Sequence, residues 1–419
     1  MERRRGVPVT AARLSAALLA AALVAGCAST PPAESPRPVP VPAPDTLGRP
    51  VEPAPVRVPD LPPAPARTSV RLAFVGDINL GTLTLPDGVP PDNARGLFAA
   101  ARPHLTGDLV IGNFEGVLGD SGVTYKCGKE GRRVPAPPDS AAPRRRAAPP
   151  RPAGQPSLCY AFLTPTHLAG SLRDAGLTHL NLANNHANDF GAEARSRTEA
   201  IFDSLGLSHY GPLGRVSLDT VRRGDSVTTV ALLGFTTYPY AYDLLDIPRS
   251  AAVVDSLRSL ADLVVVTFHG GAEGSRALHV PQAAESLATE PRGDLRRWAR
   301  AVIDAGADAV VGHGPHVLRG IEFYEGRPIV YSLGNFLTYR GFNLAGPLGI
   351  TAVLQLELEG GGAYRAGRLV PMVQIPRAGP RDDPSGAALE LVRALSLEDF
   401  PGTAAAIDPE GGLHPPGVP

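Results

Sequence analysis

Residues 309–316 read Ala-Val-Val-Gly-His-Gly-Pro-His, an apolar run that ends in two histidines. The apolar residues predict a short buried β-strand, and the glycines and proline predict a tight turn directly after it. Glycines flank His313, and Pro315 fixes the backbone before His316, so this spacing favours a functional pair over two core histidines. Nitrogen ligands at the end of a strand are suited to a divalent metal.

Five further clusters of polar residues and glycines follow apolar runs in the same way. Taken singly, each has an ordinary structural reading, such as an aspartate in a turn or a hydrogen-bonded core histidine. Because ligands in open α/β sheets collect at the carboxyl ends of strands, we expect the clusters to converge on one site. In the last cluster, Asn335 is expected to support the site wall by hydrogen-bonding a loop. The clusters are Gly76-Asp77-Ile78-Asn79-Leu80, Gly112-Asn113-Phe114-Glu115-Gly116, Asn184-Asn185-His186, His269-Gly270-Gly271 and Ser332-Leu333-Gly334-Asn335-Phe336.

Apolar β-rich runs alternate with helical stretches between Val70 and Gln374, which predicts a layered α/β fold. Strand-helix units are expected in the first two thirds and antiparallel pairing in the last third. The predicted strands are 70–75, 109–112, 179–182, 228–234, 263–268, 309–311, 321–324, 329–332, 350–358 and 364–373. The predicted helices are 91–101, 165–175, 192–205, 250–260, 294–305 and 387–397.

The order of the clusters resembles that of the calcineurin-like metallophosphoesterase superfamily. Within it, the spellings Gly-Asp-x-Asn-Leu, Asn-Phe-Glu-Gly, Asn-Asn-His-Ala-x-Asp-x-Gly, Gly-His-x-Pro-His-Val-Leu and Tyr-Ser-Leu-Gly-Asn-Phe resemble the poly-γ-glutamate capsule-synthesis (CapA-type) family. The resemblance covers residues 71–373. It implies a four-layer αββα metallophosphatase-like sandwich at residues 69–376, followed by a C-terminal extension at 377–419.

The resemblance also implies a site for two divalent ions of manganese, iron or zinc. Asp77 and His316 would bind the first ion, and Glu115 would take the bridging position. The ligands of the second ion would be Asn185, His269 and His313. Two further candidate positions depart from the superfamily pattern and weaken the first metal position: Asn79 replaces a histidine, and Asn113 with Glu115 replaces an aspartate pair.

His186 would lie beside the leaving group as the general acid, again by resemblance. Asp189, three positions on, has two interpretations that the sequence leaves open. It could orient or modulate His186, or it could cap the helix that begins near Gly191.

The N-terminal residues predict export and a lipid anchor. Residues 1–27 combine early arginines with a short apolar run and end in Val-Ala-Gly-Cys, which resembles a bacterial lipobox with Cys27 as the lipidated residue. The Pro-rich residues 28–68 predict an extended tether, with a reach of roughly 100 Å at about 3.1 Å per residue. We therefore expect an extracytoplasmic domain anchored to the cell membrane or the outer membrane.

Cys127 and Cys159 remain as a pair if Cys27 is lipidated, and they can close a disulfide in an oxidising compartment. They bracket a Pro- and Arg-rich insertion at residues 128–158. This insertion is either a solvated, flexible segment or a basic lid that attracts a polyanion.

Three functional hypotheses follow for the domain, and the third assigns it no chemistry. The first is a metal-dependent hydrolase or phosphoesterase acting on a cell-envelope substrate in capsule biosynthesis. The second is a non-catalytic, metal-containing protein that guides an anionic polymer during capsule export, together with membrane-bound capsule-synthesis proteins. The third is a metal-free structural lipoprotein. The formal net charge of −1 gives no general attraction for nucleic acid, and none is expected as a partner.

Overall fold

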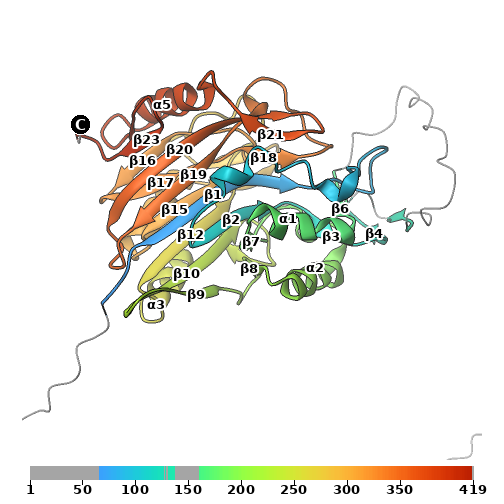
Figure 1. The fold of residues 1–419 in the computed structure, drawn as a ribbon, viewed down its shortest axis with the longest axis horizontal. Coiled ribbons are helices and arrows are strands. Elements are labelled where there is room, and N and C mark those ends of the chain that lie inside the picture. Colours follow the sequence, from blue (N-terminus) through green and yellow to red (C-terminus); the bar gives the residue numbers. More distant parts are fainter. Residues whose placement is uncertain (1–65, 127, 129–130, 137–159, 418–419) are drawn as a thin grey trace, which may run out of the picture. The chain divides into compact units, whose positions relative to one another are not determined.

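A computed structural model describes residues 66–126, 128, 131–136 and 160–417 (Figure 1). The predicted signal peptide, almost all of the tether, the three cysteines and most of the basic insertion lie outside these residues. Among the helices of the described ranges, none has both the length and the apolar character needed to cross a bilayer.

The described residues include a ten-stranded sheet in which β1, β2, β7 and β8 run parallel, β19 pairs antiparallel with β1, and β20 pairs antiparallel with β19. The strands are β1 (Val70–Asn79), β2 (Leu109–Phe114), β7 (His179–Asn181), β8 (Ser208–Tyr210), β18 (Asn335–Thr338), β19 (Ile350–Leu358), β20 (Tyr364–Ile375), β21 (Gly379–Asp382), β22 (Ala406–Ile407) and β23 (Gly412–His414).

A second, seven-stranded sheet in the described part of the chain has β10, β12, β15 and β17 in parallel at its centre. Its strands are β9 (Ser217–Arg223), β10 (Ser226–Thr236), β11 (Tyr242–Asp243), β12 (Leu263–His269), β15 (Ala309–His313), β16 (Ile321–Tyr324) and β17 (Arg327–Val330). Every strand range predicted from the sequence overlaps an observed strand of one of the two sheets.

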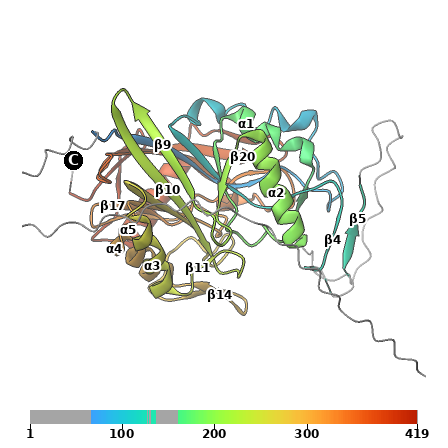
Figure 2. The ribbon, with the colours of Figure 1, turned by 90° about the horizontal axis from the view of Figure 1, so that it is seen from below.

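Three two-stranded ribbons complete the described strands. They are β3 (Val117–Leu118) with β6 (Leu163–Thr164), β13 (Glu285–Leu287) with β14 (Glu290–Gly293), and β4 (Gly122–Thr124) with β5 (Arg132–Val134). We call the β4–β5 ribbon with the connecting Tyr125 and Lys126 the arm. It projects at the end of the molecule where α2 lies, as Figures 1 and 2 both show.

Alternating side chains place the core between the two sheets and on both of their outer faces. In β1, Leu72 and Phe74 belong to a cluster that also contains Leu232 and Val265 of the second sheet. Ala73 and Val75 face the other way, into a cluster with residues of α1 and α2. The outer face of the second sheet packs against α3 and α4, where Trp298 is fully buried. A strand buried on both faces accounts for its continuous apolar sequence.

Capping residues are found at the end of two helices and at the start of two others. Gly176 and Gly206 adopt left-handed conformations at the ends of α1 and α2. Asp246 and Asp294 accept hydrogen bonds at the starts of α3 and α4. The helices are α1 (Gly170–Ala175), α2 (Gly191–Leu205), α3 (Ile247–Leu257), α4 (Leu295–Asp304) and α5 (Ala387–Asp399), with 3₁₀ turns at Asp92–Ala94, Arg102–His104, Thr166–Leu168 and Gly346–Gly349.

The helix predicted at residues 91–101 is wrong, and the one predicted at 165–175 is only partly right. Asp92, Asn93 and Ala94 have positive φ angles, which a right-handed helix excludes, so the first segment forms turns. Leu97 and Phe98 are nevertheless buried. The second segment divides into a 3₁₀ turn and α1.

The predicted C-terminal extension belongs to the same compact unit as the sheets. Residues of β21 and β23 pair with β20, and α5 contributes Leu389 and Val392 to the core between the sheets. Residue 376 is therefore not a boundary between compact units.

Candidate metal centre

Strand register brings the polar clusters together at the carboxyl edge of both sheets. Asp77 lies opposite Asn113 on the neighbouring parallel strand, and His269 lies opposite His313 in the second sheet. Residues in register on adjacent parallel strands occupy the same height, so each sheet presents a row of side chains at this edge. Glu115 and His186 follow β2 and β7 in the loops at the same edge.

The turn between His313 and His316 requires the glycine at position 314. A Cβ at Gly314 would lie 2.7 Å from the Gly270 carbonyl oxygen, so the two turns approach each other more closely than any other residue would permit. His316 has a φ of 62°, an uncommon value for a residue with a side chain. Asn335 Nδ2 donates hydrogen bonds to the His316 and Leu348 carbonyl oxygens, both at 3.1 Å, which confirms its expected supporting role.

Asp77, Glu115 and His316 each offer a ligand atom within 4.8 Å of the other two. His316 Nδ1 lies 2.9 Å from Asp77 Oδ2, and His313 Nδ1 lies 3.4 Å from Asp77 Oδ1. Asp77 and Glu115 are fully buried. A strand of one sheet, the loop after the neighbouring strand and a turn of the other sheet thus contribute to a single compact group.

Three histidine nitrogens lie around the Glu115 carboxylate, and none of them is within hydrogen-bonding distance of it. The Nε2 atoms of His316, His186 and His269 lie 3.7, 3.8 and 3.9 Å from Glu115 Oε1. Neither carboxylate oxygen has a hydrogen-bond partner among the described residues, although both are inaccessible to solvent. A buried carboxylate left in this state is strongly unfavourable unless a cation compensates its charge or a proton neutralises it.

Burial and neighbouring charges shift the pKa values of the cluster in opposite directions. Burial raises the pKa of the Glu115 carboxyl well above its ordinary value, and the charges of Asp77 and Glu273 add to the rise. Burial acts to raise the pKa of Asp77 too, but His313 and His316 outweigh it and hold that pKa far below the usual range. Burial acts to lower the pKa of His316, whereas Glu115 and Asp77 raise it to about 10. The acidic groups therefore draw positive charge into the cluster.

His269 and His186 respond to burial alone more strongly than to their neighbours, and burial lowers the pKa of both imidazoles. Neutral imidazole is the form that binds metals. His269 Nε2 and both ring nitrogens of His313 are buried and have no hydrogen-bond partner within the described part of the chain.

The amides predicted near the first metal position have other partners. Asn79 Nδ2 donates to the Glu115 carbonyl oxygen at 2.9 Å, and Asn79 Oδ1 accepts from the Gly81 N–H. Asn113 Nδ2 donates to Asp77 Oδ1 at 2.8 Å, while its oxygen accepts from Asn181 and Asn184. Both amides hold the ligand-bearing loops in place and direct no free oxygen at Glu115.

Asn185 differs from its neighbour Asn184. The Asn184 side chain is fully engaged, because it donates to Asn113 and to the Phe114 carbonyl oxygen and accepts from the His186 N–H. Asn185 Oδ1 is buried and has no partner among the described residues. Of the two, only Asn185 has an oxygen available for a ligand.

Asp189 is held against His186 and does not cap the following helix. Its Oδ2 accepts a 2.7 Å hydrogen bond from His186 Nδ1, and α2 has no side-chain cap. Of the two interpretations left open by the sequence, the described geometry matches the orientation of His186.

Two side chains near the centre were not singled out from the sequence. Lys126 of the arm lies 2.6 Å from Asp189 Oδ1, and Glu273 Oε2 lies 3.9 Å from His316 Nε2. Glu273 follows the His269 cluster by a few residues, so its position was a usable signal. Lys126 contacts residues about sixty positions away, and no local pattern indicates that.

An aromatic pair spans the histidines at either end of the centre. The Phe162 ring packs against His186 with centroids 4.4 Å apart, and the Phe342 ring lies 5.3 Å from that of His316. The two phenyl rings stack at 5.1 Å. They form an apolar wall that limits water on this side of Glu115.

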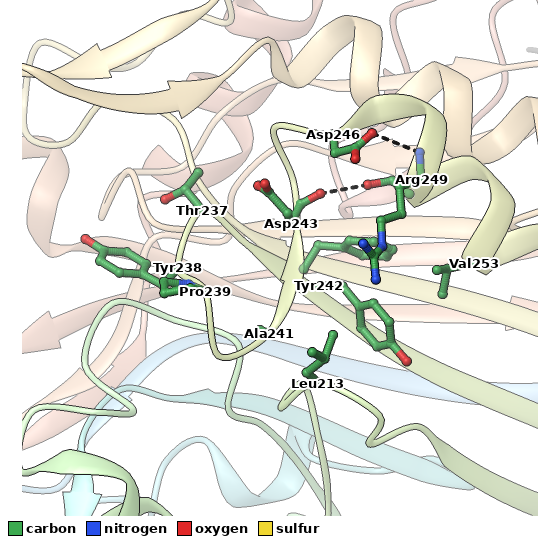
Figure 3. Close-up of a pocket in the computed structure, with 12 residues that line it drawn as sticks. Leu213, Thr237, Tyr238, Pro239, Ala241, Tyr242, Asp243, Asp246, Arg249 and Val253 are labelled. Atoms are coloured by element: carbon green, nitrogen blue, oxygen red, sulfur yellow. Dashed lines mark hydrogen bonds between the residues drawn. The ribbon is translucent and has the colours of Figure 1, made fainter.

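A cavity of about 270 Å³ lies beyond β10, at the start of α3 (Figure 3). Tyr238, Tyr242 and Arg249 line it, and none of the residues predicted for the metal centre does. The cavity is therefore separate from the candidate chemistry.

The donor atoms of the centre fit a divalent cation. Among the predicted ligands, buried atoms without partners in the described residues are found on Glu115, Asn185, His269 and His313. Mixed nitrogen and oxygen ligands suit zinc, iron or manganese. Burying donor atoms of this kind without hydrogen-bond partners is energetically unfavourable unless a ligand binds them.

Comparison with known proteins identifies related sequences. The family model described as bacterial capsule synthesis protein PGA_cap matches residues 71–340. The PGA biosynthesis protein CapA of Bacillus subtilis (strain 168) is 33% identical over 209 residues, 46% of this chain and 50% of that protein. The capsule biosynthesis protein CapA of Bacillus anthracis is 33% identical over 190 residues, 41% of this chain and 43% of that protein. The chain thus spans about half the length of these relatives.

Among solved structures, the chain is similar to a 5′-nucleotidase precursor from Thermus thermophilus. The TM-score is 0.36 with 14% sequence identity, and the match covers 79% of this chain and 59% of the other. At that level the similarity bears on neither the site nor its chemistry.

Proposed function

Because the chain belongs to the PGA_cap family of bacterial capsule synthesis proteins, within the metallophosphoesterase-like superfamily, we propose that it is a metal-dependent hydrolase of the cell envelope. Its substrate would be a phosphoester or an anionic polymer used in capsule production. The observation that carries this proposal is the buried Glu115 carboxylate, which has no hydrogen-bond partner in the described ranges and lies beside three histidine nitrogens. A lipid anchor at Cys27 would hold the domain at the outer face of a membrane.

The proposed ligands divide into two sets that share Glu115. Asp77 and His316 would hold one divalent ion with it, and Asn185, His269 and His313 would hold a second. Bound divalent ions supply Lewis-acid polarisation of a phosphoryl oxygen. Asn79 and Asn113 would keep the ligand-bearing loops in register through their hydrogen bonds.

His186 would transfer a proton to the leaving oxygen from Nε2. Its Nδ1 is bonded to Asp189, so the ring is held with Nε2 on the side of Glu115. Phe162 packs on the ring and restricts water there. A positioned proton donor of this kind contributes about 10²- to 10⁴-fold to a rate.

Metal content of the full chain, measured by mass spectrometry, tests the binding part of the proposal. We expect about two equivalents of a transition metal per chain, lost in Asp77→Ala and His313→Ala. The exposed His279, which pairs with Asp399, provides a matched control, and His279→Ala should keep the metal. Absence of metal from the wild-type chain after reconstitution would refute the proposal.

Turnover separates the hydrolase from a polymer-guiding protein. His186→Ala should keep its metal and lose hydrolysis of aryl phosphates by about 10²-fold or more. The wild-type chain with bound metal is tested in the same assays. If it binds polyglutamate but hydrolyses neither aryl phosphates nor the polymer, the result supports the non-catalytic role.

A further inference from the structure

Asp189 is a buried carboxylate that receives donors from three separate segments. His186 Nδ1 and the Phe162 N–H lie 2.7 Å from its Oδ2, and Lys126 Nζ lies 2.6 Å from its Oδ1. The Asp189 side chain is 1% exposed, whereas that of Lys126 is 35% exposed. No other donor in the described ranges reaches Asp189 Oδ1, so Lys126 alone satisfies that oxygen.

Lys126 also restricts where the His186 ring can carry its proton. Its Nζ lies 3.1 Å from His186 Nδ1, the same atom that contacts Asp189. An ammonium can only donate, and so can an Nδ1–H, so the Lys126 contact opposes a proton on Nδ1 whereas the Asp189 carboxylate requires one there. Since the carboxylate contact is the shorter one and Asp189 is ringed by donors, the proton of the neutral ring lies on Nδ1 and the Nε2 lone pair faces the centre. Under the proposed function, Nε2 is then the ring atom through which a proton reaches the leaving oxygen.

We propose that Lys126 is a positioning residue for the His186–Asp189 pair. This inference rests on the proposed hydrolase function for its catalytic consequence. By holding Asp189 Oδ1, the ammonium keeps the carboxylate aimed at Nδ1, which fixes both the ring orientation and the tautomer. A second donor of Lys126 reaches the Asn185 carbonyl oxygen at 3.0 Å, so the same side chain also supports the loop before His186.

The arm and the proton donor are thereby one unit. Thr124, on β4, donates through Oγ1 to the Asp189 carbonyl oxygen at 2.6 Å, and the Lys126 N–H donates to Thr124 Oγ1 at 3.3 Å. Two side chains of the arm thus hold the backbone and the carboxylate of Asp189. The proton-transfer pair is complete only when the arm is seated on this loop.

The test compares Lys126→Met with Lys126→Arg in the full chain. Arg133→Met is the matched control, because Arg133 lies on the same arm, is exposed and has no side-chain contact to the centre among the described residues. Nitrogen NMR of histidine-labelled protein reports the tautomer of His186 directly and needs no activity. We expect an Nδ1–H ring in the wild type, Lys126→Arg and Arg133→Met, and a mixture of tautomers in Lys126→Met.

Kinetics with two aryl phosphates then tests the consequence. Loss of a well-placed proton donor should lower kcat for phenyl phosphate by about tenfold or more, and much less for 4-nitrophenyl phosphate, whose leaving group needs no proton. Metal content should be unchanged, and Lys126→Arg should recover the rate. An unchanged His186 ring in Lys126→Met, or loss of metal from that variant, would overturn the inference. An inactive wild type with the expected tautomer change would refute the hydrolase and leave the positioning role standing.

Discussion

Two glutamates among the described residues are fully buried, and their surroundings are opposite. Glu322, on β16, accepts hydrogen bonds from Arg300, Tyr331 and Thr403, with distances of 2.6 to 3.2 Å. Glu115 accepts none from the described residues and faces histidine nitrogens 3.7 to 3.9 Å away. Both side chains have no measurable exposure. Burial alone therefore does not distinguish them, whereas hydrogen-bond satisfaction does.

The contrast separates a structural carboxylate from one that requires a ligand. Folding compensates the desolvation of Glu322 with internal donors, so this residue needs nothing more. Folding leaves the desolvation of Glu115 uncompensated, which natural proteins tolerate mainly at functional sites. The same test identifies His269 and His313, whose buried nitrogens also lack partners in the described structure.

Removal of Glu322 should cause the largest loss of stability. Glu322→Ala leaves Arg300, Tyr331 and Thr403 without their acceptor, and we expect the free energy of unfolding to fall by about 3 kcal/mol. Urea denaturation of the metal-free chain measures it. The half-exposed Glu359, paired with Arg365, is a control expected to change by less than about 1 kcal/mol. If Glu115→Ala destabilises the metal-free chain as much as Glu322→Ala does, the comparison fails.

Added metal should reverse the roles of the two glutamates. At about 100 times its Kd, a divalent ion should stabilise the wild type by about 2.7 kcal/mol, because it binds only the folded chain. Glu115→Gln should lose this increment, and Glu322→Ala should keep it despite its lower starting stability. Thermal unfolding with and without manganese or zinc measures both. Equal stabilisation of Glu115→Gln and the wild type would place the ion elsewhere.

The strands and the convergence of the ligands could be predicted because each ligand follows an apolar run. Once residues 70–75 and 109–112 are read as parallel strands, their carboxyl ends must carry Asp77 and Asn113 to one edge, and residues 263–268 and 309–311 carry His269 and His313 together in the same way. The turns at Asp92–Ala94 could not be predicted, because apolar spacing there matches a helix while positive φ angles exclude one.

Side-chain satisfaction could not be predicted from the sequence at all. Nothing near Glu115 indicates that it lacks partners, and nothing near Glu322 indicates that Arg300 and Thr403 will reach it. The same holds for Asn79 and Asn113, whose amides are directed by contacts across strands. These outcomes depend on tertiary distances of a few tenths of an ångström.

The metal-free centre should also make stability depend on pH. His316 has a pKa of about 10 when folded and 6.5 as its ordinary value, so the folded chain binds more protons than the unfolded chain between these values. The stabilising contribution of His316 should therefore be fully present below about pH 6.5 and should be lost as pH rises towards 10. From this group, the free energy of unfolding should change by at most about 1.4 kcal/mol per pH unit. His316→Gln should flatten the slope and His279→Gln should not. A slope unaffected by His316→Gln would assign it to another group.

The smallest expected effect is on the support of His316. Asn335→Ala removes two hydrogen bonds, to the His316 and Leu348 carbonyl oxygens, and should lower stability by about 1 kcal/mol. It should also weaken metal binding by about tenfold, because the turn that places His316 at a positive φ is no longer held. The control is Asn343→Ala, an exposed residue that accepts only from the nearby Ala345 N–H. Calorimetric titration with metal decides between two readings of Asn335. If stability falls while the affinity for metal is unchanged, Asn335 resembles Glu322, whose hydrogen bonds serve the fold alone. If the affinity for metal also weakens, Asn335 belongs with Glu115 to the metal centre, although it binds no ligand itself.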